Sequence, residues 1–202
     1  MTPTTAQPVP GFLGNAMFRR FSVREYHKMI EAGVFVDGEP IELLEGYVVQ
    51  KMARGTPYDF AVQALNKRLV RLLPSGWDVR VQCAITLTES EPEPDFAIVR
   101  GDESAYRDHH PGPAEIGTLI EISSSSLATD RGDKARIYAR AGIPEYWVVI
   151  VIEKVVEVFT RPSGPAEAPA YEVKEEYPVG TAIPIVLAGQ LVGSIAVADV
   201  MG

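Results

Sequence analysis

The chain has 202 residues, of which 46% are hydrophobic and 23% charged, a composition typical of a globular protein and not of a disordered one. Its formal net charge of −8 argues against a general nucleic-acid coat protein, but it is compatible with an enzyme that has a local basic cleft. The single cysteine, Cys83, excludes an intramolecular disulfide and a cysteine-rich zinc site, and it fits a reducing compartment.

The chain begins with a stretch, residues 1–17, that contains three prolines and few regularly spaced apolar residues. We expect a flexible tail there and a single domain over residues 18–202. The opening has no secretory signal pattern, and no apolar run approaches the roughly 18 residues of a membrane span. We therefore expect a cytoplasmic protein that has no membrane partner.

A helix and a hairpin are predicted at the start of the domain. Ser22 and Glu25 have the spacing of a capping box, which predicts that a helix begins there. Residues 41–52 then predict a strand pair with a bend at Gly46. Glu45 interrupts this apolar stretch, and its position is equally compatible with a solvent-facing side chain and with a functional site.

An amphipathic helix is predicted over residues 56–73, before Pro74. Three basic residues, Lys67, Arg68 and Arg71, lie opposite its apolar stripe. They could contact a phosphate backbone, although a solvated helix face is the commoner explanation.

Two apolar strands in the middle of the chain carry acids. Residues 96–99 form a short continuous apolar run, typical of a strand buried on both faces, and Asp95 directly precedes it. Residues 118–122 form a second run, which Glu121 interrupts. Because an unpaired carboxylate in a buried sheet is costly, Glu121 needs a metal, a lysine or a position at the strand end.

A further helix is predicted from Asp130 onward, where Asp130, Lys134 and Tyr138 recur at intervals of four and so share one face. Acids at strand ends beside a lysine suggest metal-assisted phosphoryl chemistry. The simpler alternative is an exposed acid–lysine pair. A zinc hydrolase using His109 and His110 is less favoured, because adjacent residues point apart and no other histidine pair supplies ligands.

The last part of the chain predicts additional strands. Residues 143–162 predict two strands joined by a tight turn, and residues 163–202 contain a short strand followed by an apolar, glycine-punctuated end. We expect this second segment to be an antiparallel extension of the core, with an apolar surface through which the protein forms a homodimer.

The motifs ELLEG, PDFAIV, EISSSSL, D-x-x-x-K-x-x-x-Y and GIPEYW follow one another in this order. Together they resemble the Uma-type restriction endonuclease family, a former domain of unknown function in the PD-(D/E)XK nuclease superfamily, over residues 18 to about 162. The resemblance implies an α/β (α+β) restriction-endonuclease-like fold, in which helices flank a central mixed β-sheet and extra antiparallel strands lie at the C-terminal side. It also implies a Mg²⁺-dependent endonuclease, with Mn²⁺ able to substitute, that hydrolyses the phosphodiester bonds of DNA.

The resemblance implies roles for individual residues as well. Asp95 and Glu121 would be catalytic Mg²⁺ ligands, joined by the backbone carbonyl of Ile122 and by waters. The superfamily lysine usually stands two residues after the acid, where this chain has Ser123. The resemblance places the lysine on the following helix instead, as Lys134, which would orient the attacking water and balance developing charge. Auxiliary or supporting roles fall to Glu45, Ser123, Asp130 and Tyr138.

The sequence departs from the pattern of the family in three respects. Tyr58 and Asp59 stand where members often have a histidine, Ser124 stands where they often have an aspartate, and Ile150 replaces an acid. These departures and the acidic net charge favour an alternative function, that of an interaction protein that keeps the nuclease fold without its catalysis.

Overall fold

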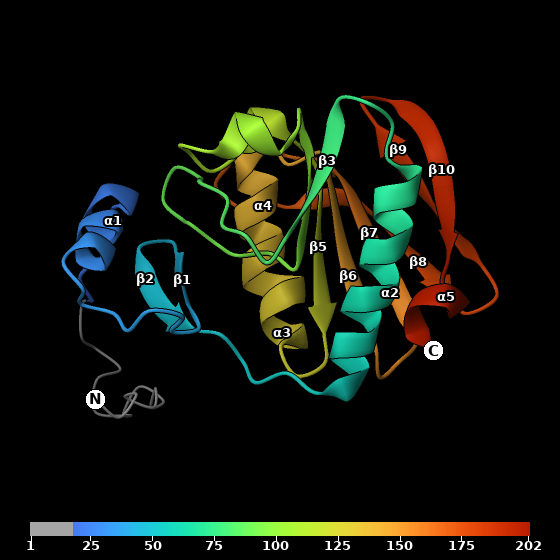
Figure 1. Ribbon diagram of the computed structural model, residues 1–202, viewed down its shortest axis with the longest axis horizontal. Coiled ribbons are helices and arrows are strands. Elements are labelled where there is room, and N and C mark those ends of the chain that lie inside the picture. The colour runs from blue at the N-terminus through green and yellow to red at the C-terminus, as the bar shows by residue number, and fades with distance from the viewer. Residues whose placement is uncertain (1–17) are drawn as a thin grey trace.

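The computed structural model describes residues 18–202, so the tail predicted at residues 1–17 lies outside the described residues. A six-stranded mixed sheet forms its centre (Figure 1). The neighbours β5 and β6 run parallel, and the other pairs are antiparallel. The strands lie in the order β3 (Trp77–Val81), β4 (Phe96–Arg100), β5 (Ile116–Ser123), β6 (Glu145–Ile150), β7 (Val155–Pro162) and β8 (Tyr171–Pro178). The predicted α/β class with a central mixed sheet is confirmed.

Helices and two hairpins surround this sheet. The α-helices are α1 (Val23–Glu31), α2 (Thr56–Leu72), α3 (Leu127–Thr129), α4 (Ala135–Ala141) and α5 (Ala198–Met201). The segment η4 (Asp130–Lys134) is π-helical, and η2 (Glu103–Tyr106) and η3 (Pro113–Glu115) are 3₁₀ turns. The hairpins are β1 (Ile41–Leu44) with β2 (Tyr47–Gln50), and β9 (Ala182–Leu187) with β10 (Gln190–Ala196). No helix within residues 18–202 is long and apolar enough to cross a lipid bilayer.

The predicted start of the domain is confirmed in detail. Ser22 is the N-cap of α1, and its hydroxyl accepts from the Glu25 N–H while the Glu25 carboxylate accepts from the Ser22 N–H. The β1–β2 hairpin turns at Glu45 and Gly46, whose φ angles of 47° and 82° suit a tight two-residue turn. Glycine tolerates this left-handed conformation readily, whereas Glu45 adopts it at a cost.

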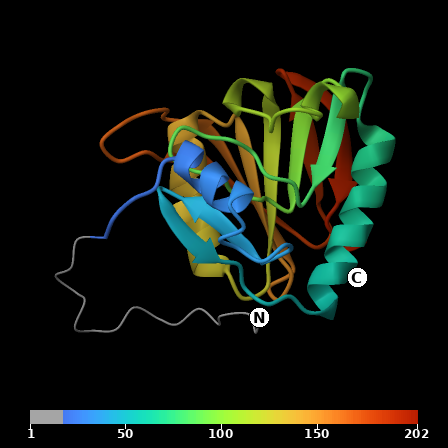
Figure 2. The same ribbon diagram turned by 60° about the vertical axis from the view of Figure 1, so that its left-hand side comes forward.

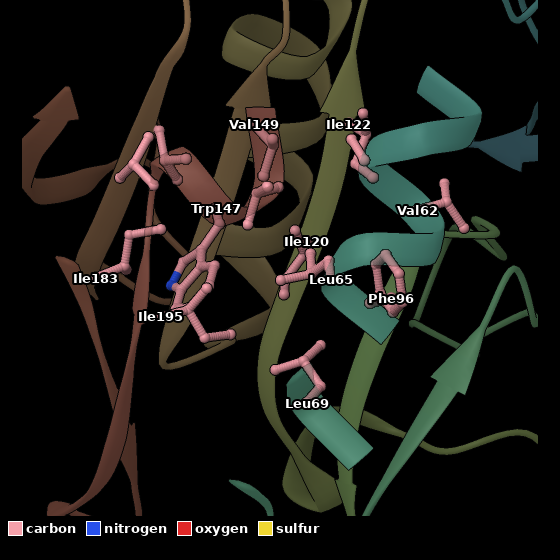
Figure 3. Packing of buried hydrophobic residues seen from close by; sticks show 14 of the residues in the cluster. Val62, Leu65, Leu69, Phe96, Ile120, Ile122, Trp147, Val149, Ile183 and Ile195 are labelled. Carbon is pink, nitrogen blue, oxygen red and sulfur yellow. The ribbon is translucent and has the colours of Figure 1, made fainter. Parts of the chain in front are cut away.

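Alternation along the strands divides the apolar side chains between two layers. Phe96 and Ile98 of β4, Ile120 of β5 and Trp147 of β6 face α2 and form one core with Leu65 (Figure 3). The β9–β10 hairpin closes the same layer, and its apolar side chains pack onto this core. The residues between these positions point to the opposite face of the sheet, because successive side chains of a strand alternate.

That opposite face is covered by α4 and, beyond it, by α1 and the β1–β2 hairpin (Figures 1 and 2). Ala97 of β4 and Leu119 of β5 pack there against Tyr138 of α4 and Tyr146 of β6. Glu121 has the same parity as Leu119, so the sheet presents its carboxylate to α4 and not to α2.

The connection between β5 and β6 contains α3, η4 and α4, as two adjacent parallel strands require a crossover. A continuous α-helix from Asp130 was the prediction for this segment. The helical segment instead begins at Leu127 and passes through the π turn before α4, which ends at Gly142 with φ 75°. A π turn changes the angular spacing of its side chains, and such turns are frequent at functional sites.

The C-terminal part divides between two sheets. β8 pairs with β7 at the edge of the central sheet, whereas β9 and β10 pair with each other. The antiparallel strands predicted at the C-terminal side are therefore present. The boundaries predicted for the core and for the extension stay predictions.

Candidate active site

Strand register brings Asp95 and Glu121 to one place. Phe96 of β4 pairs with Ile120 of β5. Continuing this antiparallel register by one residue sets Asp95 opposite Glu121, where cross-strand neighbours have Cβ atoms ~5 Å apart. The alternation of side chains places both residues on the face of the sheet that α4 covers, and both are buried. Two acids that are 26 positions apart in the chain therefore share one edge of the sheet.

Glu121 is held by two residues of the following helical segment. Its Oε1 accepts a hydrogen bond of 2.9 Å from Lys134 Nζ and another of 2.9 Å from the Tyr138 hydroxyl. Burial raises the pKa of Glu121 to about 8, Lys134 opposes that rise, and the nearby carboxyl of Asp95 adds to it. The carboxyl is thus poised to lose a proton when a cation binds near it.

Lys134 joins Glu121 to a second acid, Glu42 of β1. Its ammonium lies 3.1 Å from Glu42 Oε1, and its side chain is only 6% exposed. Burial would lower the pKa of Lys134, but Glu121 and Glu42 outweigh burial and raise the pKa above its ordinary value. The lysine therefore carries its charge at neutral pH, and the predicted reach of the helix back to the sheet is present.

The sequence pattern did not single out Glu42. It has the same strand parity as Leu44, which packs against the α4 face, and this alternation is the signal that could have found it. Its other oxygen, Oε2, accepts from the Glu93 N–H at 3.1 Å, so the hairpin is fixed to the loop before β4.

Glu45 was expected as the auxiliary acid, but the structure places its carboxylate among arginines and not at Lys134. Arg136 Nη2 is 2.7 Å from Glu45 Oε2, and Arg140 also donates to this carboxylate. The hydrogen bond from Arg136 is the main reason that the pKa of Glu45 is lowered to about 2. The tight turn at Gly46 carries Glu45 out of the strand, and Glu42 takes the position beside the lysine.

Asp95 has a second set of partners. Its Oδ2 accepts from the Ile122 N–H at 2.7 Å, and its Oδ1 accepts from the Tyr58 hydroxyl. Gln82 Nε2 in turn donates to the Tyr58 oxygen at 2.8 Å. Tyr58 therefore fixes the orientation of the Asp95 carboxylate.

The other residues expected to have supporting roles lie beside these acids. The Asp130 carboxylate accepts from the Ser126 hydroxyl at 2.6 Å, and burial raises the pKa of Asp130. Ser123, at the end of β5, is buried, and its hydroxyl has no hydrogen-bond partner among the described residues. Tyr138 contacts Glu121 and not the lysine, so it holds the acid in place.

These groups open into one cleft of about 650 Å³ between the β1–β2 hairpin, the start of α2 and the α3–η4 segment. Its walls include Glu42, Asp95, Glu121, Asp130 and Lys134. The β1–β2 hairpin, which lies in front of α4 in Figure 2, contributes Glu42, Leu44 and Val49 to the walls. A cleft of this size has room for part of an extended substrate beside the buried acids.

The donor set suits a small, hard cation. Over the described range 18–202, no cluster of three or more histidine, cysteine, aspartate or glutamate side chains is arranged to hold a metal. Mg²⁺ does not need one, because it commonly binds through one or two carboxylates and keeps several waters. Asp95 and Glu121 supply the carboxylates. The Ile122 carbonyl lies on the same strand edge as the N–H that donates to Asp95.

The histidines do not belong to this group. His109 Nε2 lies 3.7 Å from Glu115 Oε1, with both side chains largely exposed. His109 and His110 are absent from the walls of the cleft.

The similarities to known proteins agree with this geometry. The model of the Uma2 family, described as "Putative restriction endonuclease", matches residues 23–190. A comparison with curated proteins finds no match. The fold is similar to the crystal structure of a putative nuclease belonging to DUF820 from Anabaena variabilis ATCC 29413, with a TM-score of 0.66 and 14% sequence identity. The similarity covers 90% of this chain and 97% of that one. The predicted resemblance is confirmed: the chain belongs to the Uma2 family of putative restriction endonucleases.

Proposed function

We propose that this protein is a metal-dependent endonuclease that hydrolyses phosphodiester bonds of DNA in the cleft beside Asp95 and Glu121. The observation that carries the proposal is the buried ammonium of Lys134, 2.9 Å from Glu121 Oε1, at the floor of a cleft that also contains Asp95. An acid pair with an adjacent lysine is the arrangement that the family pattern implies. Membership of a family described as nucleases supports the same assignment.

Asp95, Glu121 and the Ile122 carbonyl would hold Mg²⁺, or Mn²⁺ in its place. When bound, such an ion would polarise a phosphodiester oxygen, lower the pKa of a water and stabilise the leaving oxygen. Tyr58 and the Ile122 N–H fix the two oxygens of Asp95, while Tyr138 fixes one oxygen of Glu121. The carboxylates are therefore oriented before substrate arrives, which reduces the reorganisation needed during reaction.

Lys134 acts by its charge in this proposal. Because Glu121 and Glu42 keep its pKa high, the ammonium is a poor proton acceptor at neutral pH. It instead orients the attacking water and offsets the negative charge that develops on the phosphoryl oxygens. Glu42 positions the ammonium, and the carboxyl of Asp130 lies near enough to interact with its charge.

A second candidate, an interaction protein that keeps the fold without catalysis, rests on a specific observation. Lys134 and Tyr138 already bind one oxygen of Glu121, and the described residues offer no third acid arranged for metal binding. This arrangement is also what a purely structural ion pair would show. Activity separates the two candidates.

The test is a nicking assay on supercoiled plasmid with Mg²⁺ or Mn²⁺. Asp95→Ala and Lys134→Ala are compared with the wild type, and Lys67→Ala, on the exposed side of α2, is the matched control for the loss of a lysine. We expect metal-dependent nicking by the wild type and by Lys67→Ala, and none by the two cleft variants. Nicking that is unchanged in the cleft variants would reject this site, and an inactive wild type would favour the interaction protein.

We also propose that the protein forms a homodimer and acts in the cytoplasm. Support for a dimer comes from Leu191 of β10 and Val179, two large apolar side chains of the C-terminal part that remain exposed. A dimer mass at micromolar concentration in sedimentation equilibrium is the expected result, and a monomer mass would contradict it. The single cysteine, Cys83, allows no intramolecular disulfide, which fits a reducing compartment such as the cytoplasm.

A further inference from the structure

The cleft contains one cation whose hydrogen-bonding capacity is unused. Among the described residues, its basic side chains are Lys51, Arg54 and Lys134. Lys134 is bound to Glu121 and Glu42, and Lys51 Nζ donates to the Glu93 carboxylate at 3.1 Å and to its carbonyl at 3.0 Å. The Arg54 guanidinium makes no hydrogen bond to any residue between 18 and 202.

The position of Arg54 is nevertheless well defined. It lies in the loop between β2 and α2, with 33% of its side chain exposed. Its guanidinium carbon is 4.8 Å from the centroid of the Tyr58 ring. Its Nη2 lies 3.7 Å from Asp95 Oδ1, the oxygen to which Tyr58 donates. Stacking on the tyrosine thus places the cation beside the acid at a distance too long for a hydrogen bond.

An arginine at this position lowers the affinity of the site for a metal cation, so we expect it to have another role. A positive charge close to Asp95 weakens the attraction of that carboxylate for a metal cation. An arriving phosphodiester changes the balance, because a guanidinium has five N–H donors in a planar fork that matches the oxygens of a phosphate. Lysine has no such fork, so the two residues are not equivalent here.

We propose that Arg54 binds the non-bridging oxygens of a substrate phosphodiester in the cleft, and so sets the position of the nucleic-acid strand relative to Asp95 and Glu121. The inference rests on the proposed nuclease function and adds a substrate-binding residue to it. No hydrogen bond to the described residues holds Arg54 in place. Its guanidinium can therefore move from Asp95 towards the substrate.

The test separates DNA binding from metal binding. Affinity for a short fluorescein-labelled duplex DNA is measured with Ca²⁺ in place of Mg²⁺, and affinity for Mn²⁺ alone is measured by calorimetry. The variants are Arg54→Ala and Arg54→Lys. Arg71→Ala, which removes an exposed arginine at the far end of α2, is the matched control.

We expect Arg54→Ala to weaken DNA binding about tenfold and to reduce the slope of log affinity against log salt by about one. Arg54→Lys should restore only part of the affinity, and Arg71→Ala should match the wild type. Binding of Mn²⁺ by Arg54→Ala should stay the same or strengthen, because a cation beside Asp95 has been removed. A side chain that only supports the fold would not shift the two affinities in opposite directions.

Two outcomes overturn the inference and leave the proposed function intact: DNA affinity of Arg54→Ala equal to the wild type, or parallel loss of DNA and Mn²⁺ binding, which would show a supporting role. A wild type that binds Mn²⁺ and nicks plasmid establishes the nuclease independently of Arg54. A wild type that binds neither DNA nor Mn²⁺ overturns the proposed function and the inference together.

Discussion

Two buried glutamates on the same face of the sheet, Glu121 on β5 and Glu157 on β7, have opposite electrostatic surroundings. Glu157 accepts from Arg131 Nε and Nη2, each at 2.8 Å, and from Lys174 at 2.8 Å. Burial would raise the pKa of Glu157, but these two cations outweigh it and lower the pKa. For Glu121 burial prevails, and its pKa rises to about 8 although Lys134 is adjacent.

The pKa values of the two glutamates differ because the number of cations relative to acids differs between their surroundings. Two cations contact Glu157, so it ties η4 to β7 and β8 and has no need of a further cation. Each of these cations also contacts one exposed acid, Glu153 for Arg131 and Glu176 for Lys174. Around Glu121, four buried acids line the cleft; these acids are Glu42, Asp95, Glu121 and Asp130. Among the described residues, the cations paired with them are Lys134, which contacts Glu42 and Glu121, and the partly exposed Arg54, 3.7 Å from Asp95. An excess of buried carboxyls over cations is costly without a compensating charge, and a divalent ion supplies one. The same short segment, η4, carries both Arg131 and Lys134.

Substitutions that neutralise acids at these two sites should have their largest effect on catalysis. Asp95→Asn or Glu121→Gln should lower metal-dependent nicking by about 100-fold or more, as the removal of one electrostatic group from an active site commonly does. Glu157→Gln should retain nicking within a few-fold at a temperature where it is folded, because its carboxylate does not face the cleft. Initial rates on supercoiled plasmid measure both. Equal losses in all three variants would remove the distinction between the two glutamates.

The next effect is on stability, where the order of the two sites reverses. Glu157→Gln should reduce the free energy of unfolding by about 2 kcal/mol, since it leaves Arg131 and Lys174 beside a buried neutral group. Glu153→Gln is the matched control, because Glu153 is an exposed second partner of Arg131 at 3.6 Å, and it should change stability by less than about 0.5 kcal/mol. Urea unfolding at neutral pH gives these values. A larger loss for Glu153→Gln would contradict the assignment of Glu157 as the structural tie.

The raised pKa of Glu121 predicts a pH dependence. A carboxyl whose pKa rises from its ordinary value near 4.5 to about 8 on folding contributes stability at low pH that is lost as pH increases between these values. Glu121→Gln should have a flatter profile of melting temperature between about pH 5 and pH 8. Saturating Mn²⁺ should also flatten the profile of the wild type, because the ion binds the ionised carboxylate. A profile that is the same in Glu121→Gln without metal would show that Glu121 is already ionised.

The smallest effect is expected at the hairpin. Glu45→Gln weakens the contacts to Arg136 and Arg140, so stability at pH 7 should fall by about 1 kcal/mol. Since folding lowers the pKa of Glu45 to about 2, the wild type should lose this contribution as pH falls from about 4.5 towards 2. Nicking should stay within about threefold of the wild type, because Glu42 and not Glu45 contacts Lys134. A loss as large as that of Glu121→Gln would return Glu45 to the catalytic group.

Much of the fold follows from local patterns. The capping box at Ser22 and Glu25, the bend at Gly46 and the apolar runs at 96–99 and 118–122 predict elements that the structure contains. The π turn at 130–134 could not be predicted, because it depends on tertiary contacts such as Arg131 with Glu157 and not on local propensity. Long-range packing decided the local geometry there.

The candidate site likewise contains residues that the sequence predicts and residues that only the tertiary structure reveals. The sequence predicts Asp95 and Glu121 because these acids adjoin or interrupt apolar runs, whereas Lys134 follows from its spacing on the helix and from the resemblance to the family. The structure brings Glu121 and Lys134 into contact. Glu42 and Arg54 were missed. Glu42 lies within β1, whereas Glu45 lies in the turn that follows it, and Arg54 comes near Asp95 through the loop between β2 and α2. The register between β4 and β5 likewise cannot be obtained from either strand alone.

The most direct test of the acid-rich site is calorimetric titration of Mn²⁺ into the wild type, Asp95→Asn, Glu121→Gln and Glu157→Gln, each at two pH values below pH 8. We predict one bound ion in the wild type, tighter at the higher pH, with protons released on binding because Glu121 must ionise. We expect the same binding in Glu157→Gln and none in the two cleft variants. Binding that persists unchanged in Asp95→Asn and Glu121→Gln would contradict the account, because the ion would then lie elsewhere.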